Sequence, residues 1–280
     1  MGNAIDPLKL IKSMGADILR LWVASADYRN DVSVSDNIIK QCAEAYRKIR
    51  NTCRFILGNL YDFDPAKDTV EYHNLNELDR WALLKLHRLI KRVSKAYDDY
   101  EFHVVFHTVH NFCTVDLSSI YFDILKDRLY CCHPNDPARK AAQTVLYELI
   151  NALVVILTPI LAYTSEEIYS HLRKENDPVS VQLLEWPEYK EEYIDEALEA
   201  RMSRVLEVRE AVTKSLEEAR ARKVIGHSLA ARVTIYAAPD WLSLLKTVDD
   251  LEKVFIVSQV ELKTADERTP EAISLEELPG

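Results

Sequence analysis

Glycine, proline and paired cysteines are scarce in this sequence. Its 280 residues include only 5 glycines and 10 prolines, which is few for an all-β or a disordered chain and typical of long helices. The 5 cysteines contain no pair separated by two residues, so the spacing of common structural zinc sites is missing and no metal centre is expected. We interpret them as small buried residues of a protein in a reducing, cytoplasmic compartment. The cysteines are Cys42, Cys53, Cys113, Cys131 and Cys132.

Long hydrophobic runs are also missing. The longest apolar run covers residues 152–163, contains Thr158 and Pro159, and is shorter than the roughly 20 residues that cross a bilayer. The sequence does not begin with a charged segment followed by an apolar stretch, so a secretory signal is not expected. We interpret the apolar run as part of a buried helix and expect no membrane partner.

Positive charge is in deficit overall but locally concentrated. The formal net charge is −10, which argues against a general nucleic-acid binder, since such proteins are usually basic, and DNA is not an expected partner. Acidic residues collect in residues 185–199 and 261–277, whereas basic residues concentrate in residues 40–54 and 80–95. A local basic face can still bind RNA, because the Debye length is about 8 Å at physiological salt.

Helix start signals are easy to read in the first sixty residues. Asp6 followed by Pro7 predicts a short helix that ends at Gly15, and a second helix follows from Asp17. Ser35 is expected to cap a long helix with apolar residues spaced by threes and fours. Another face of this helix carries polar and basic candidates for RNA contact, namely Arg47, Arg50, Asn51 and Arg54.

The next predicted helix, over residues 78–100, carries two stripes. One is apolar, and the other consists of an aromatic residue followed by basic residues at helical spacing. This second stripe suits phosphate contacts and base stacking. The alternative interpretation is a solvated face whose tryptophan packs on a neighbouring helix. If the two basic helices pack antiparallel, their basic residues are expected to flank one groove. The second stripe consists of Trp81, Lys85, Arg88, Arg92 and Lys95.

Three histidines follow at metal-ligand spacing. His103, His107 and His110 stand at i, i+4 and i+7, but Cys113 and Asp116 are expected to point away from their stripe. A fourth ligand is therefore missing, and packing histidines are favoured over a zinc site. Further along, a buried helix is expected from residue 138 to 158. A capping box of Thr164 and Glu167 is expected to start the next helix.

The last ninety residues change in character. Residues 194–221 predict a long charged helix, and residues 232–237 alternate with the period of a strand. A helix over residues 239–253 and a second strand over residues 254–258 complete a small α/β subdomain, with parallel pairing and a right-handed crossover expected. The polar, acidic tail, residues 264–280, is expected to be partly disordered.

Four stretches resemble a known family. Residues 15–32, GADILRLWVASADYRNDV, resemble the segment that follows the KMSKS signature of class I aminoacyl-tRNA synthetases, specifically the isoleucyl family. Residues 111–130, NFCTVDLSSIYFDILKDRLY, resemble a core helix of the anticodon-binding bundle of that family. Residues 159–169, PILAYTSEEIY, and residues 185–187, EWP, also match.

The resemblance implies a piece of a larger enzyme. The second signature lysine, which neutralises ATP phosphates in the family, would lie two residues before Met1, and the sequence carries no HIGH-like motif, glycine-rich phosphate loop or Walker lysine. No catalytic residue and no cofactor is therefore expected in this chain. The parent enzyme would use ATP with Mg²⁺ to charge isoleucine tRNA, and any zinc would be bound by regions beyond this sequence.

The expected fold class is mainly α, a helical bundle followed by a small α/β subdomain. Residues 1–34 would form stem-contact helices and a linker, residues 35–190 the anticodon-binding bundle, and residues 191–280 the long helix and part of a junction domain. The expected function is recognition of isoleucine tRNA by a monomer. Two alternatives remain open: a helical scaffold for protein partners, and a free-standing RNA-binding protein.

Overall fold

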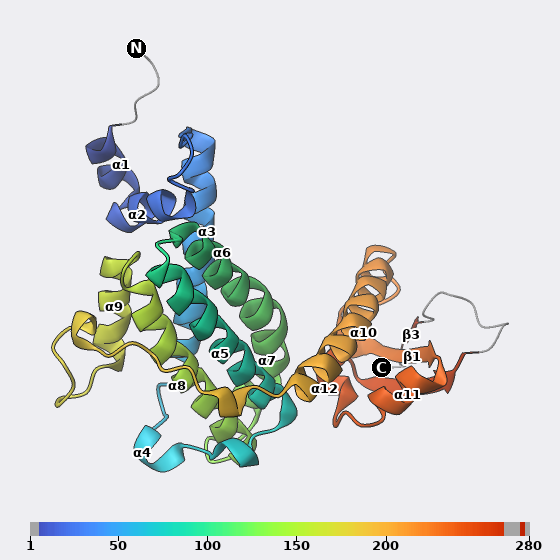
Figure 1. The fold of residues 1–280 in the computed structure, drawn as a ribbon. Coiled ribbons are helices and arrows are strands. Elements are labelled where there is room, and N and C mark those ends of the chain that lie inside the picture. Colours follow the sequence, from blue (N-terminus) through green and yellow to red (C-terminus); the bar gives the residue numbers. More distant parts are fainter. Residues whose placement is uncertain (1–5, 266–274, 278–280) are drawn as a thin grey trace. The chain divides into compact units, whose positions relative to one another are not determined.

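The computed structural model describes residues 6–265 and the backbone of residues 275–277, and most of this part of the chain is helical (Figure 1). The chain divides into two compact units, residues 1–194 and 195–280. The expected fold class, a helical bundle followed by a small α/β part, is confirmed. The long helices of the first unit are α1 (Pro7–Met14), α2 (Ala16–Ser25), α3 (Asp36–Gly58), α5 (Glu77–Asp98), α6 (Phe102–Asn111), α7 (Phe122–Cys131), α8 (Pro137–Leu157) and α9 (Ala162–Leu172). Short helical turns are α4 (Pro65–Asp68), η1 (Tyr72–Asn74), η3 (Val181–Leu183) and η4 (Glu191–Tyr193).

The first helices begin and end where the sequence predicts. The Asp6 carboxylate accepts a hydrogen bond from the Leu8 amide at 3.0 Å, and Gly15 adopts φ +94° between α1 and α2, a conformation that favours glycine. The Ser35 hydroxyl accepts from the Ile38 amide at 3.3 Å and caps α3. The helices α1 and α2 pack on the start of α3 within the first unit, around a cluster of Leu10, Ile18, Ile39 and Ala43.

Helix α8 is the most completely buried helix of the bundle. It packs against α5, α7, α9 and α3, and Leu146, Leu149 and Ile150 are fully buried along it. Within the described residues it is the one helix with the length and composition of a membrane span, but 72% of its most apolar window is buried inside the bundle. That degree of burial is typical of the core helix of a bundle.

A π-helical segment, η2 (Phe112–Tyr121), joins α6 to α7 in one continuous helical path. The wider turn of a π-helix is reflected in two side-chain hydrogen bonds that reach five residues back. The Ser118 hydroxyl donates to the Cys113 carbonyl at 2.7 Å, and the Ser119 hydroxyl donates to the Thr114 carbonyl at 2.8 Å. The predicted core helix at residues 111–130 therefore exists, but its first half does not follow the α-helical period.

A buried ion pair fastens α5 to η2 and α7. Asp79, in the first turn of α5, is fully buried and accepts two hydrogen bonds from the Arg128 guanidinium, at 2.7 and 2.8 Å. The Tyr121 hydroxyl donates to the same carboxylate at 2.7 Å, and burial raises the pKa of this phenol well above its usual range. The bidentate geometry offsets part of the cost of removing both charges from water.

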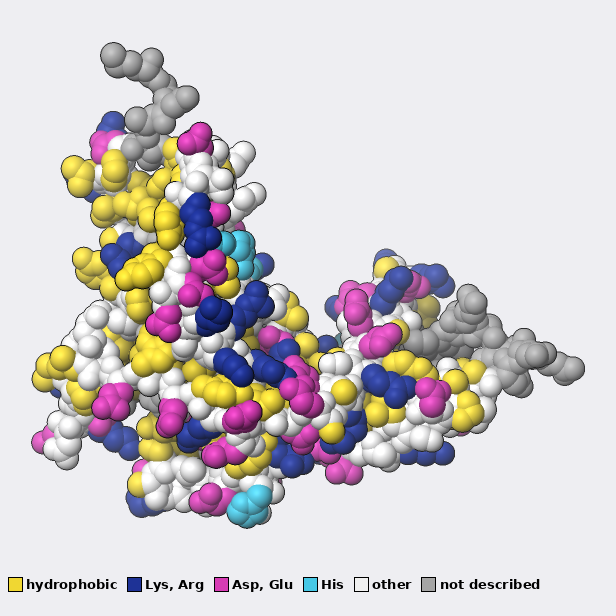
Figure 2. Space-filling view, viewed as in Figure 1, with side chains coloured by type: hydrophobic (Ala, Val, Ile, Leu, Met, Phe, Trp, Pro, Cys, Tyr) yellow, Lys and Arg dark blue, Asp and Glu magenta, His cyan; other side chains and the backbone are white. Residues whose placement is uncertain are grey.

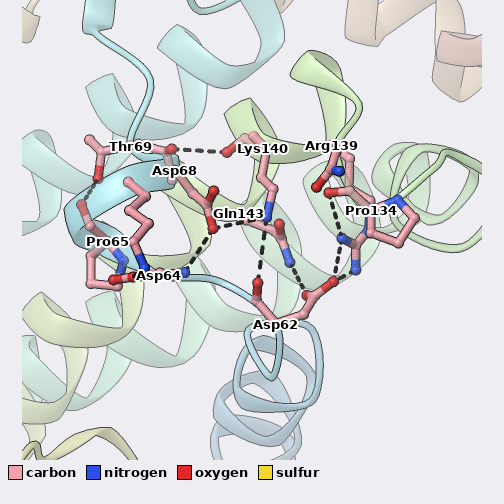
Figure 3. A network of polar contacts seen from close by, with 12 residues as sticks. Asp62, Asp64, Pro65, Asp68, Thr69, Pro134, Arg139, Lys140 and Gln143 are labelled. Atoms are coloured by element: carbon pink, nitrogen blue, oxygen red, sulfur yellow. Dashed lines mark hydrogen bonds and ion pairs between the residues drawn. The ribbon is translucent and has the colours of Figure 1, made fainter.

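A second polar network ties the connection after α3 to α8 (Figure 3). The Asp62 carboxylate accepts from the Arg139 guanidinium at 2.7 and 3.1 Å and from the Gln143 amide at 2.7 Å. Burial alone would raise the pKa of Asp62, but the bonds from Arg139 and Gln143 outweigh it and lower that pKa. Lys140 pairs with Asp68 at 2.9 Å. The connection is thus held to α8 by partly buried ion pairs.

The start of α9 is capped from another helix, so the predicted capping box is wrong. Asp17 of α2 accepts hydrogen bonds from the Thr164 amide at 2.7 Å and from the Thr164 hydroxyl at 2.6 Å. Glu167, the expected second member of the box, instead pairs with Arg50 of α3 at 3.2 Å. A carboxylate at a helix N-terminus meets the exposed amides and the positive end of the dipole, and here it is supplied from a distant part of the sequence.

The segment that leads to η4 crosses α5 and covers His87. The His87 Nδ1 atom accepts a hydrogen bond from the Lys190 amide at 3.2 Å, and the Tyr193 ring lies 4.6 Å from the imidazole. Burial, and then the positive charge of Lys190, lower the pKa of His87 to about 4. The imidazole is therefore neutral at pH 7 and serves as an acceptor that fastens the segment.

The second unit is a small α/β fold. Helix α10 (Glu196–Ala221), the expected long charged helix, buries Leu198, Met202, Val205, Val212 and Leu216. Strand β1 lies between β2, to which it is parallel, and β3, to which it is antiparallel. Parallel pairing is as expected from the sequence. The other elements are η5 (Ser228–Ala230), β1 (Ala231–Ala237), α11 (Pro239–Leu245), α12 (Leu251–Phe255), β2 (Gln259–Thr264) and β3 (Leu275–Glu277).

Two boundaries in this unit differ from the prediction. The single helix expected over residues 239–253 is split into α11 and α12 by a turn over residues 246–250, where Asp250 adopts φ +54°. The second strand is five residues later than expected, since Val254 and Phe255 are buried in α12. Residues 266–274 and 278–280 of the tail expected to be disordered lie outside the described residues. Residues 275–277 form β3, which the sequence analysis missed.

Candidate nucleic-acid interface

Three residues of the predicted basic stripe line one groove. Lys85, Arg88 and Arg92 project from α5 toward α6 and η2, and the space between has a volume of about 340 Å³. Figure 2 shows lysine and arginine side chains gathered over this face, with acidic side chains beside them. We call this space the α5 groove. It is lined by Lys85, Arg88, Leu89, Arg92, His107, Thr108, Asn111, Phe112 and Asp116.

The packing of α5 explains why these cations reach the surface. Asn76 caps the helix by accepting from the Asp79 amide at 2.8 Å. Its apolar stripe, which includes Leu86 and Ile90, is buried in the bundle. The basic stripe is offset from the apolar one around the helix, so its longer side chains extend to the edge of the contact with α6.

The α5 groove mixes charges of both signs. Asp116 of η2 approaches the Lys85 ammonium at 3.5 Å, and its side chain is only 15% exposed. The Thr108 hydroxyl oxygen, also in the wall, is buried and has no hydrogen-bond partner within the described part of the chain.

The expectation that a base stacks on Trp81 is wrong. Trp81 is 2% exposed and packs in the bundle core, and the Lys85 ammonium lies 5.9 Å from its ring centroid. The alternative that the sequence left open, a tryptophan packed on a neighbouring helix, describes the structure. The aromatic side chain that is exposed in the groove wall is His107.

The basic residues of α3 line a different groove. Arg50 and Arg54 face α9 across a space of about 340 Å³ that also includes Glu167 and His171. The principal contacts of α3 are with α2, η2 and α8, whereas those of α5 are with α6, α8 and η2. The expectation that both basic stripes flank one groove is therefore wrong, because η2 and α8 stand between them.

The remaining predicted residues lie outside both grooves. Arg47 is exposed on α3 and pairs with Glu44 one turn earlier. Lys95 is exposed near the end of α5 and pairs with Asp99 at 2.5 Å. Asn51 is exposed on α3. These positions are accessible to a large ligand but do not form part of a concave site.

The three histidines have separate surroundings. The His103 Nδ1 atom is buried and unpartnered among the described residues, whereas the rings of His107 and His110 both contact Phe106, at 4.9 and 6.0 Å. Burial, followed by the charges of Lys48 and His107, lowers the pKa of His110. Among residues 6–265, whose side chains the structure describes, no group of three or more His, Cys, Asp or Glu residues could hold a metal ion.

Sequence reasoning missed Asp116 and Asn111 as groove residues. Asp116 follows His107 by nine residues, about two and a half turns of an α-helix, which would place the two on opposite sides. The π-helical path of η2 changes that register, and both line the α5 groove. The sequence feature that pointed to this part of the groove was His107, because the spacing of the three histidines marked it as a candidate.

Two family models match the chain. The anticodon-binding domain of tRNA ligase matches residues 79–235, more than half of the chain. The model of tRNA synthetases class I (I, L, M and V) matches residues 1–35. The bundle with its basic groove is thus of the class of tRNA ligase domains that bind anticodons. The chain belongs to the family of anticodon-binding domains of tRNA ligases.

Relatives that match the whole chain are isoleucine–tRNA ligases. The protein of Syntrophomonas wolfei is 70% identical over 280 residues, which cover 100% of this chain and 30% of the relative. That of Moorella thermoacetica is 56% identical over 284 aligned residues, with the same coverage. The chain therefore spans about 30% of the length of the relatives that it matches. The family resemblance drawn from the sequence is confirmed.

A solved structure shares the fold. It is the LeuRS–tRNA–LeuAMS ternary complex of Agrobacterium radiobacter, with a TM-score of 0.50 and 14% sequence identity. The likeness covers 93% of this chain and 30% of that one. At this identity it bears on the arrangement of the helices alone.

Proposed function

We propose that this chain binds isoleucine tRNA as the anticodon-binding part of a longer isoleucine–tRNA ligase. The parent would activate isoleucine with ATP and Mg²⁺ in the cytoplasm and transfer it to tRNA, while the 280-residue chain binds RNA as a monomer without catalysing either step. The observation that carries the proposal is the α5 groove, whose arginines lie inside the matched anticodon-binding region.

Phosphate contact is the chemistry that this groove supports best. Arg88 and Arg92 stand one turn apart on a helix that is fixed by its buried face, and guanidinium groups pair well with phosphate oxygens. Each contact releases condensed counterions, so binding falls with rising salt. The other groove, lined by Arg50 and Arg54, also contains Glu167, which pairs with Arg50 at 3.2 Å.

The test is a titration of isoleucine tRNA against the chain at several salt concentrations. Replacing Arg88 and Arg92 by glutamate should weaken binding on the order of tenfold or more and flatten the salt dependence. The matched control reverses Lys67 and Lys126, which are exposed and lie outside both grooves. It produces the same change in net charge. Equal loss in both double variants would contradict a role for the α5 groove.

Two further measurements separate parts of the proposal. A tRNA with a swapped anticodon should bind more weakly than isoleucine tRNA, and equal binding would contradict anticodon recognition. The purified chain should show no isoleucine-dependent exchange of pyrophosphate into ATP. Exchange above that of a mock purification would contradict the proposed lack of catalysis.

A further inference from the structure

We propose that a cavity between α5 and α8 binds a small organic cation, in which an amine is joined to an apolar body, and that Glu148 pairs with the amine. The cavity has a volume of about 540 Å³, which is in the range of small-ligand sites. We call it the α8 cavity. It lies in the first unit, and none of its lining residues among those described lines either basic groove, so this inference is independent of the proposed RNA binding.

Apolar side chains form much of the wall of the α8 cavity. They come from the buried face of α5, from one side of α8 and from residues 184–190, which add a third side. Apolar ligand surface placed against them is removed from water, which favours binding. The body of the ligand is therefore expected to be apolar. The apolar lining residues are Leu86, Ile90, Ala152, Val155, Leu184 and Pro187.

One carboxylate in this wall has no directed partner. Glu148, in the middle of α8, lines the cavity and is half-buried. Within the described part of the chain it has neither a hydrogen bond nor an ion pair. Burial raises the pKa of Glu148, and the charge of Lys190 offsets only part of that effect. A carboxylate that has lost water without gaining a partner is stabilised by a cation that pairs with it.

The groups around Glu148 favour a cation over an anion. Glu185 and Glu188 also line the cavity, so three carboxylates stand against the one ammonium of Lys190. Asn151, three residues beyond Glu148, donates its side-chain N–H to the Tyr147 carbonyl at 2.7 Å. The side-chain oxygen of Asn151 is left as a second acceptor, and residues three apart on a helix lie on one face. An ammonium brings three donors to these acceptors.

The wall also contains a buried donor without an acceptor. His87 lines the cavity and is 4% exposed, and its Nε2 atom has no hydrogen-bond partner within the described residues. Because Nδ1 accepts from the Lys190 amide at 3.2 Å, the neutral ring carries its proton on Nε2. Buried donors nearly always have a partner, so this one is a second sign that the wall is incomplete without a further molecule. A neutral imidazole also does not repel a cation.

A purely structural role for Glu148 leads to a different expectation. Lys190 is exposed, and its ammonium lies 5.6 Å from the centre of the Tyr193 ring. If Glu148 serves only to attract Lys190, removing the lysine charge would leave ligand binding unchanged. If Glu148 binds an amine, Lys190 competes with that amine, and removing its charge should strengthen binding.

The experiment titrates the whole chain with two small molecules, tyramine and 4-ethylphenol, and follows binding by nuclear magnetic resonance of the ligand. The two molecules share the aromatic ring and the hydroxyl and differ in the amine, which is charged at pH 7. Tyramine should bind about tenfold more tightly, the effect of one hydrogen bond to a charged group.

Three variants locate the effect. In Glu148→Gln the preference for tyramine should fall to about one, because the amide has no charge. Glu175→Gln is the matched control, since Glu175 is exposed outside the cavity and its replacement changes the net charge equally; it should keep the preference. In Lys190→Met the affinity for tyramine should rise about threefold while that for 4-ethylphenol stays the same. The bond to His87 is kept in this variant, because it comes from the backbone of Lys190.

Equal binding of the two molecules by the unaltered chain, or binding of neither, would overturn this inference and leave the proposed function standing. A preference for tyramine that survives in Glu148→Gln would also overturn it. If Glu148→Gln does not fold, Lys190→Met decides, and unchanged or weaker binding of tyramine by that variant would overturn the inference.

Discussion

Helix α5 carries two ionic clusters that differ in one respect, their access to water. In its first turn Asp79 is fully buried and its partners are Arg128 and Tyr121. Farther along the same helix, Arg88 and Arg92 line a groove that is open to solvent. Both clusters combine arginine with aspartate, since Asp116 lines the groove beside Arg88 and Arg92. Their surroundings decide whether a charge stabilises the fold or remains available to a ligand.

The difference follows from the solvation that each charge would lose if its partners were removed. The buried carboxylate has exchanged water for three directed hydrogen bonds at 2.7–2.8 Å, so removing Arg128 leaves a buried charge with only the Tyr121 hydroxyl to solvate it. Arg92, by contrast, is exposed to solvent, so its guanidinium keeps hydration that a phosphate can replace. Mutations on α5 and its partners should therefore separate cleanly into effects on stability and effects on binding.

The largest effect is expected where the buried pair is broken. Arg128→Ala should lower the free energy of unfolding by about 3–5 kcal/mol, because Asp79 is left charged and buried. Arg92→Ala, on the exposed side of the same helix, should change it by less than about 0.5 kcal/mol. Urea denaturation followed by circular dichroism measures both. Similar losses of unfolding free energy in the two variants would contradict the conclusion that the buried cluster stabilises the fold more than the groove cluster does.

Trp81 gives the next test, because it lies between the two clusters on α5. Trp81→Leu should lower the free energy of unfolding by about 2–4 kcal/mol, since a cavity remains in the core. The affinity for isoleucine tRNA, measured at a temperature where the variant is folded, should not change. A selective loss of tRNA affinity with unaltered stability would show that the ring is reached by a base after all.

His87, on the buried side of α5, should make stability depend on pH. Its pKa is 6.5 in its ordinary state and about 4 in the folded chain, so between these values the unfolded state binds more protons. The contribution, on the order of 2 kcal/mol, is fully present above pH 6.5 and is lost as the pH falls toward 4. In His87→Phe the stability difference between pH 7 and pH 4.5 should shrink accordingly. An unchanged difference would mean that His87 titrates normally in the fold.

The sequence predicted the elements that depend on local chemistry. Asp6, Gly15 and Ser35 mark helix ends through their own backbone or side-chain bonds, and each lies where expected. The period of the apolar stripe on α5 likewise identified the face that is buried. These signals need no knowledge of the neighbouring helices.

What the sequence could not predict depends on partners that are distant along the chain. The basic stripes of α3 and α5 have similar spacing but line separate grooves, because other helices lie between them. The residues of either stripe give no sign of this arrangement. Trp81 is covered by the bundle although its spacing continues the basic row. Asp116 enters the groove through the register of η2, which an α-helical period misplaces.

Two polar side chains attach α2 to the bend between α8 and α9. Arg20 donates to the carbonyl oxygens of Ile160 and Pro159 at 2.8 and 2.7 Å, and Asp17, one turn earlier, caps α9 at Thr164. Arg20 and Asp17 carry opposite charges, and both bind the same bend between α8 and α9. The segment matched by the synthetase model is thus fastened to helices matched by the anticodon-binding model.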